Sequence, residues 1–135
     1  MIRLFFALGS VLAGLAVAVG AWSAHSSALN EIQALWLEKA VRYQIIHALA
    51  LLATSLLMAS HATPSKTAVA AGVSFLGGCL CFCGSLYVMA FSSIDAGLVT
   101  PAGGMLFLLG WACLACCAPK FALDRQVLCR LVLRL

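Results

Sequence analysis

The sequence carries very little charge. Of its 135 residues, 9% are Asp, Glu, Lys or Arg, and 64% are apolar. An ordinary soluble domain is about 25% charged and about 45–50% apolar, and a soluble fold of this length has too little interior to bury the surplus. Lipid must therefore surround most of the chain, whose length allows one compact domain.

Acidic residues are the scarcest charged class, because the chain has only four Asp and Glu in total. This scarcity leaves an intramembrane proton relay of carboxylates unsupported. The sequence also lacks a Gly-rich phosphate loop, an HExxH motif, a GxSxG motif and a charge series of the voltage-sensor kind. We therefore expect no enzyme activity, no catalytic residues, no metal site and no cofactor.

Uncharged segments long enough to cross a bilayer occur four times, in residues 4–24, 45–60, 67–94 and 96–119. A spanning helix needs about 20 mostly apolar residues, and in lipid the backbone must satisfy its own hydrogen bonds. These runs are apolar on all sides, without the alternation of a barrel strand. The sequence predicts an all-α, integral membrane four-helix bundle over residues 1–119, with spans at about 4–24, 40–60, 68–91 and 98–118.

The first segment has a competing interpretation as a cleaved signal peptide, since Arg3 precedes an apolar run. Signal peptides have apolar cores of only about 7–15 residues, and this run is longer. It also carries Ser10, Gly14 and Ala18 at four-residue spacing, which lets helix backbones approach closely, and Gly9 and Gly20 add to this small-residue side. We favour a retained span.

The connection at residues 25–39 is the longest polar one and begins with good helix-capping residue types, such as Asn30. Ile32, Leu35 and Trp36 then recur at helical spacing, and Glu38 precedes Arg42 in the order that favours a helical ion pair. This pattern predicts a short interfacial helix after span one, which feeds into span two.

The distribution of Lys and Arg predicts the orientation in the membrane. With four spans, one side holds Arg3, Lys66 and the four basic residues of a tail at 120–135, and the other holds only Lys39 and Arg42. The positive-inside rule then places both termini and the 61–67 loop in the cytoplasm. The formal charge of +4 is a topology signal and predicts no nucleic-acid partner.

Span two carries the densest group of polar side chains. Tyr43, His47, Ala50 and Thr54 fall on one helical face, which we expect to point into the bundle because exposing His47 to lipid is costly. Ionisable residues inside a membrane suggest a ligand or transport site. The alternative is structural: His47 bonds to a neighbouring helix and Arg42 extends to the interface.

The seven cysteines form two groups inside apolar segments, at 79–83 and 113–117, with Cys129 in the tail. Cys113-x-x-Cys116 resembles a metal or redox motif, but such motifs gain weight on exposed loops. Buried cysteine usually packs as a small hydrophobe, which is the interpretation we favour over metal, redox chemistry or palmitoylation.

Several stretches taken together resemble one known family. They are GAWSAH at 20–25, AVRYQIIHALALL at 40–52, GSLY at 84–87, TPAGG at 100–104 and GW at 110–111. In their order and spacing, over about residues 5–115, the chain is similar to the YgdD-like family of small bacterial inner (plasma) membrane proteins, classed as a domain of unknown function (number 423). Ser23 stands where the family tends to have Gly, and neither the cysteine groups nor the tail belongs to the pattern.

The resemblance implies a multi-span inner-membrane protein and implies no activity. It draws attention to a set of polar or aromatic residues that we expect at the outer end of the bundle, as a candidate polar cluster: His25, Arg42, Tyr43, Gln44, His47, Tyr87, Thr100 and Trp111. Two functions remain open. One is a non-catalytic protein that packs with itself or with a membrane-protein partner, and the other is a small oligomeric transporter or channel-like conduit.

Overall fold

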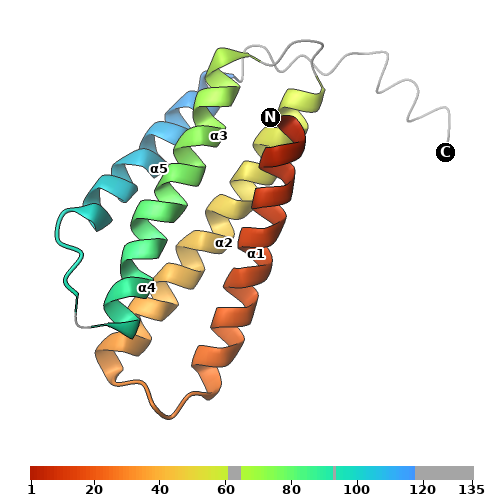
Figure 1. The fold of residues 1–135 in the computed structure, drawn as a ribbon. Coiled ribbons are helices and arrows are strands. Elements are labelled where there is room, and N and C mark those ends of the chain that lie inside the picture. The colour runs from red at the N-terminus through yellow and green to blue at the C-terminus, as the bar shows by residue number, and fades with distance from the viewer. Residues whose placement is uncertain (61–64, 93, 118–135) are drawn as a thin grey trace, which may run out of the picture.

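The computed structural model describes residues 1–60, 65–92 and 94–117, and all regular structure in these ranges is helical. Elements α3, η1 and α4 follow one another without a break and form one long helix, Lys66–Phe91. Four antiparallel helices result (Figure 1), which confirms the predicted all-α class. The elements are α1 (Ile2–His25), α2 (Glu31–Ala59), α3 (Lys66–Gly78), the π-helix η1 (Cys79–Cys83), α4 (Gly84–Phe91) and α5 (Val99–Ala115).

Three of the four helices are long and apolar enough to cross a membrane: α1, α2 and the Lys66–Phe91 helix. Helix α5 is apolar but has 17 described residues, which gives it a length of about 26 Å at 1.5 Å per residue. The predicted fourth span continued to residue 118, which lies outside the described residues, as do the predicted tail at 120–135 and most of the 61–67 loop.

Helix α2 corrects one prediction. The described residues after α1 contain no separate interfacial helix, because residues 31–39 are the first turns of α2 itself. Asn30 caps this helix: its side chain accepts a hydrogen bond from the Gln33 backbone N–H, and the Gln33 side chain accepts one from the Asn30 backbone N–H. Neither Gly nor Pro follows before Ala59, so nothing breaks the helix, and Leu37 is already fully buried.

Helix α1 packs mainly against α2, through only some of the small residues that the sequence predicts. Gly9 lies so close to α2 that an added Cβ would be 3.0 Å from the Ala48 carbonyl oxygen, and Ala16 is fully buried. The predicted contact residues Ser10, Gly14 and Ala18 are all exposed in the described chain. Small residues do mediate the contact between these two helices, but they are Gly9, Ala16 and Gly20 and not Ser10, Gly14 and Ala18.

The interface between α5 and the α3–η1 helix is built from phenylalanines that pack on glycines. A Cβ added to Gly78 would lie 2.4 Å from the Phe107 ring, and one added to Gly110 would lie 2.6 Å from the Phe75 ring. Each helix therefore places a phenylalanine ring in the space that a glycine leaves on the other helix. Small residues at helix interfaces allow this close approach in membranes, where packing replaces the hydrophobic effect as a driving force.

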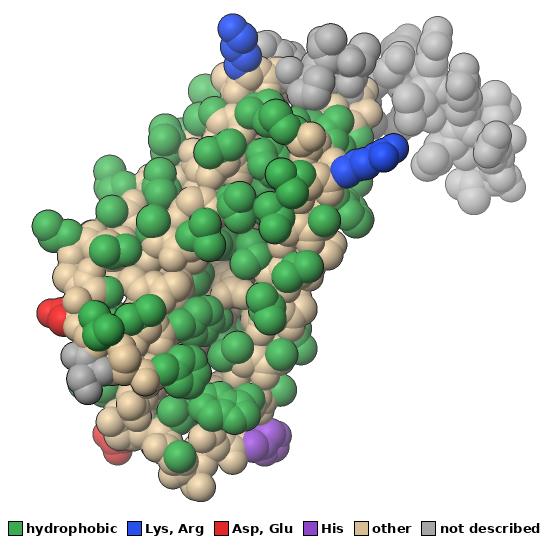
Figure 2. All heavy atoms as spheres, viewed as in Figure 1, with side chains coloured by type: hydrophobic (Ala, Val, Ile, Leu, Met, Phe, Trp, Pro, Cys, Tyr) green, Lys and Arg blue, Asp and Glu red, His purple; other side chains and the backbone are tan. Residues whose placement is uncertain are grey.

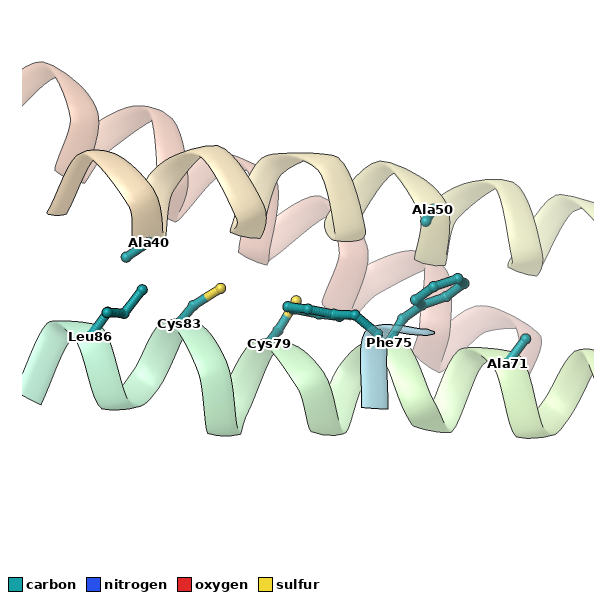
Figure 3. Close-up of a cluster of buried hydrophobic side chains, with 8 residues drawn as sticks. Ala40, Ala50, Ala71, Phe75, Cys79, Cys83 and Leu86 are labelled. Carbon is teal, nitrogen blue, oxygen red and sulfur yellow. The ribbon is translucent and has the colours of Figure 1, made fainter. Parts of the chain in front are cut away.

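The contact between α2 and the Lys66–Phe91 helix forms much of the core. Figure 3 shows Phe75, Cys79, Cys83 and Leu86 directed from this helix toward the helix that carries Ala40 and Ala50. All are at most 5% exposed. The small alanines on α2 leave the space that the larger side chains of the facing helix fill.

The surface has the distribution expected of a membrane protein. On the face shown in Figure 2, apolar side chains cover the length of the molecule, Lys and Arg lie at one end, and Asp, Glu and His lie toward the other. The antiparallel order places the starts of α1 and α3, with Arg3 and Lys66, at the same end (Figure 1). Glu31, Glu38 and Asp95 belong to the opposite end.

Candidate functional site

His47 lies at the centre of the candidate site and is 4% exposed. Its Nδ1 is 2.7 Å from the Tyr43 carbonyl oxygen, and its Nε2 is 3.2 Å from Nε1 of Trp111 on α5. The Trp indole is a donor only, so Nε2 accepts a hydrogen bond and Nδ1 carries the proton that it donates to the carbonyl. Both ring nitrogens of a neutral imidazole are therefore engaged within the protein.

Aromatic rings surround this imidazole. The Phe107 ring stacks on His47 with a centroid distance of 3.5 Å and an interplanar angle of 10°. Tyr43 lies 4.7 Å from Phe82, centroid to centroid, and Trp111 lies 5.1 Å from Phe75. Such contacts are each worth roughly 0.5–1.5 kcal/mol beyond simple burial. We call His47 and these five aromatic residues the aromatic cluster; it joins α2, the α3–η1 helix and α5.

A π-helical turn adjoins the aromatic cluster. In η1 the backbone N–H of Gly84 bonds to the Cys79 carbonyl, five residues back. Ser85 Oγ donates to the Phe82 carbonyl oxygen at 2.8 Å and lies 2.7 Å from Thr100 Oγ1 on α5. Single π-turns inside α-helices often lie at functional positions, and here the turn is connected to α5 through two hydroxyl groups.

Gly103 allows α5 to reach that turn. A Cβ on this residue would lie 2.3 Å from the backbone nitrogen of Phe82 and 2.8 Å from its Cα. Thr100 and Gly103 are one turn apart on α5, so the hydroxyl bond to Ser85 and the close backbone contact form on one face. We call Phe82, Ser85, Thr100 and Gly103 the π-turn contact.

Gln44 and Tyr87 lie outside the aromatic cluster. Gln44 is 3% exposed, and its Nε2 donates to the Leu12 carbonyl oxygen at 2.8 Å, which ties α1 to α2. The Tyr87 hydroxyl is buried and has no hydrogen-bond partner among the described residues. Tyr87 packs against the core that contains Cys79, Cys83 and Ala40.

Arg42 and His25 lie away from the aromatic cluster. The Arg42 guanidinium pairs with the Glu38 carboxylate on the exposed side of α2, and His25 is exposed at the end of α1. Of the eight predicted residues, the structure thus brings Tyr43, His47 and Trp111 into direct contact. It places Thr100 at the adjoining π-turn contact, and it holds Gln44, Tyr87, Arg42 and His25 in separate surroundings.

The described cysteines are free thiols in contrasting positions. Cys79 and Cys83 are buried in the core, while Cys116 is exposed. Cys117, which is 4% exposed, lies 3.3 Å from Thr67 Oγ1, sulfur to oxygen, and so connects the end of α5 to the start of α3. In residues 1–60, 65–92 and 94–117, no three His, Cys, Asp or Glu side chains lie together as metal ligands would.

Reasoning from sequence missed the phenylalanines, although Phe75 and Phe107 contact His47 and Phe82 packs on Phe107. Phenylalanine is so frequent in membrane helices that each one alone carries no signal. The signal that could have indicated them was their pairing with the glycines of the facing helices. Gly78 and Gly110 each contact a phenylalanine ring, and Gly103 contacts the backbone of Phe82.

The fold and this interior define a helical membrane protein with an aromatic and hydrogen-bonded centre. The family model described as "Protein of unknown function (DUF423)" matches residues 18–104. The chain belongs to this family, whose relatives carry the name UPF0382 membrane protein.

Relatives of this kind occur in distant bacteria. One from Staphylococcus aureus is 37% identical over 89% of this chain and 98% of its own. One from Haemophilus influenzae is 42% identical over 73% of this chain and 80% of its own, and one from Bacillus subtilis is 31% identical over 88% and 98%. No solved structure matches the chain. The family has no established molecular function, so function must be argued from the geometry.

Proposed function

We propose that this chain is a non-catalytic membrane protein that acts by packing and interaction, and that its polar residues hold the helices together. The engagement of both ring nitrogens of His47, one by Tyr43 and one by Trp111, carries this proposal. A general base or a metal ligand needs a nitrogen that is free to react, and this imidazole offers none. Its stacking on Phe107 also leaves no space for a substrate over that face of the ring.

We also propose that the chain spans a bacterial inner membrane four times, with both termini in the cytoplasm. Helix α5 packs along the α3–η1 helix and exposes Met105, Leu108 and Leu109 on its outer side, as a lipid-facing span does. Its 17 described residues are short for a hydrocarbon core of about 30 Å, and a bilayer adapts to such a mismatch at modest cost. Arg3 and Lys66 at one end of the bundle are balanced by Lys39 and Arg42 at the other, and the four Lys and Arg residues in the sequence at 120–135, which follows α5, favour the end with Arg3 as cytoplasmic.

The orientation is tested by labelling introduced cysteines in intact cells. Ser27 follows α1 and Ser60 ends α2, and both are exposed at opposite ends of the bundle. A maleimide that cannot cross the inner membrane should label Ser27→Cys above the level of the unmodified protein and should leave Ser60→Cys at that level until the cells are lysed. The reverse pattern would place the termini outside.

The packing function is tested in a strain that lacks its own family member, by comparing rescue with the amount of folded protein. His47→Ala and Trp111→Phe remove the two sides of the central hydrogen bond, and Ile46→Ala, on the exposed side of α2, is the control. If the cluster is structural, rescue should fall in proportion to the folded protein in the membrane. A variant that reaches the wild-type folded level and still fails to rescue would mean that the cluster is a binding or transport site.

The alternative function is a small transporter or channel-like conduit. The aromatic cluster argues against a conduit that runs through a single copy of the chain. The rings of Phe75, Phe82 and Phe107 fill the space where α2, the α3–η1 helix and α5 meet. A conduit would therefore need several copies of the chain. A mass corresponding to one copy in nanodiscs of native lipid would contradict this alternative.

A further inference from the structure

A groove of about 460 Å³ lies between the end of α1 and the first turns of α2, apart from the aromatic cluster. Small residues form its wall on α1, and Glu38 and Arg42 stand on its α2 side. Gly20 keeps the helices close here, since an added Cβ would lie 3.2 Å from Cγ1 of Val41. The lining residues are Gly20, Ser23, Ala24, Ala34, Glu38, Val41 and Arg42.

The groove lies at the depth of lipid headgroups. Helix α2 has 29 residues, so its length of about 43 Å exceeds the roughly 30 Å of the hydrocarbon core. All its charged residues fall between Glu31 and Arg42, and the stretch from Tyr43 to Ser60 has none. The boundary between hydrocarbon and headgroups therefore falls close to Arg42. Trp22, half-exposed at the same end, is typical of that boundary.

The two charges of the groove are available to a ligand. Glu38 and Arg42 pair with each other, yet their side chains are 61% and 66% exposed. A single exposed helical ion pair is weak, because water and salt screen it. A ligand that offers each partner a second counter-charge can therefore join the pair without a large cost. One helical turn, about 6 Å, separates the two residues along α2.

This arrangement complements a headgroup that carries both charges. Arg42 suits a phosphate, which its guanidinium can bind through two hydrogen bonds, and Glu38 suits an ammonium group that has N–H donors. An anionic headgroup without an amine would bring its phosphate near the Glu38 carboxylate and gain nothing there. A quaternary choline group has no N–H to donate and is too bulky for the same contact.

We propose that this groove binds an amine-bearing zwitterionic phospholipid, with its phosphate on Arg42 and its ammonium on Glu38. Gly20 and Val41 line the end of the groove nearer the hydrocarbon, where the glycerol region lies, and Ala24 and Ala34 leave room for the ammonium at the other end. The acyl chains continue along the exposed apolar surface of α1, where Val17 and Leu15 face outward. The site depends on neither leaflet assignment nor the proposed packing function, because it needs only the membrane depth of this end of the bundle.

Native mass spectrometry of the full chain in detergent tests the site. The protein is titrated separately with phosphatidylethanolamine, phosphatidylglycerol and phosphatidylcholine that have the same acyl chains. Phosphatidylethanolamine should bind at least about fivefold more tightly than the other two, which corresponds to one charge-assisted hydrogen bond at an exposed position. Equal binding of all three lipids would overturn the proposal.

Charge variants assign the contacts. Arg42→Gln and Glu38→Gln should each weaken phosphatidylethanolamine binding about fivefold. Glu38→Gln should also remove the preference over phosphatidylglycerol, whereas Arg42→Gln should weaken both. Lys39→Gln is the matched control, because Lys39 is an exposed charge between the two that does not line the groove. A loss in Lys39→Gln as large as that in Arg42→Gln would mean only a general attraction to lipid and would contradict the site.

A pair of size variants tests the groove independently of charge. Ala34→Phe fills the groove and should weaken phosphatidylethanolamine binding, while Ala21→Phe, on an exposed part of α1 outside the lining, should not. Melting curves verify that these exposed substitutions leave the bundle folded. Unchanged binding in a folded Ala34→Phe variant would overturn the proposal, and should a variant fail to fold, the three-lipid comparison on the wild type decides alone.

Discussion

Gly103→Ala is expected to lower the free energy of unfolding by about 3 kcal/mol, which is at the upper end of the usual cost of overpacking. The added methyl group would lie 2.3 Å from the backbone nitrogen of Phe82 and 2.8 Å from its Cα. A clash with the far end of a side chain can be relieved by rotation, but a backbone atom cannot rotate away. Helix α5 must therefore move outward, which separates Thr100 from Ser85 and opens the 2.7 Å contact between their hydroxyls.

The neighbouring glycine provides the control. A Cβ on Gly104 would lie 3.8 Å from the nearest atom, the Phe82 ring, so Gly104→Ala makes the same chemical change in the same turn of α5 without a clash. Alanine is favoured over glycine in a helix by up to about 1 kcal/mol, and this variant should melt at the wild-type temperature or above it. Thermal melting in mild detergent gives the comparison. Equal melting temperatures for the two variants would mean that α5 does not rest on the backbone of the π-turn.

The helices themselves could be predicted from sequence, because the bilayer imposes a length and an absence of charge that are visible residue by residue. The boundary at the start of α2 could not. Asn30 and Gln33 form a capping box, and the sequence indicates that a helix begins there. Whether the turns that follow continue into the span depends on how they pack against other helices. Leu37 and Ala40 are fully buried against neighbouring helices, and this packing keeps α2 in one piece.

The candidate site could be predicted only on α2. Helical spacing placed Tyr43, His47, Ala50 and Thr54 on one inward face; the last three are buried, whereas Tyr43 is 41% exposed. Which residues of other helices meet that face depends on the rotation and depth of each helix, which the spacing within one segment does not determine. Trp111 reaches His47 because Gly110 and Gly103 let α5 approach closely. The five residues of the π-turn at Cys79–Cys83 do not predict a π-turn. The turn lies against Thr100 and Gly103 of another helix, and these contacts cannot be predicted from the sequence of the turn itself.

His47→Ala should lower the free energy of unfolding by about 3 kcal/mol, within the range of large-to-small substitutions in a core. The substitution destabilises the fold in three ways. The imidazole no longer stacks on Phe107 at 3.5 Å, Trp111 loses the acceptor for its N–H, and a cavity remains among rings that cannot all close over it. His25→Ala removes the other described histidine, which is exposed at the end of α1, and should leave the melting temperature unchanged.

A double-mutant cycle separates the hydrogen bond from the packing. Trp111→Phe keeps an aromatic ring on α5 and removes the donor, so the cycle of His47→Ala with Trp111→Phe reports the coupling between the two side chains. Hydrogen bonds between membrane helices are worth about 0.6 kcal/mol on average and up to about 1.7 kcal/mol, and a bond in which each partner is fixed by its neighbours should lie toward the upper value. His47→Gln retains an amide oxygen that can accept from Trp111 and should recover part of the loss. If instead His47→Ala melts at or above the wild-type temperature, His47 is held at the expense of stability, and the structural role proposed for the aromatic cluster is wrong.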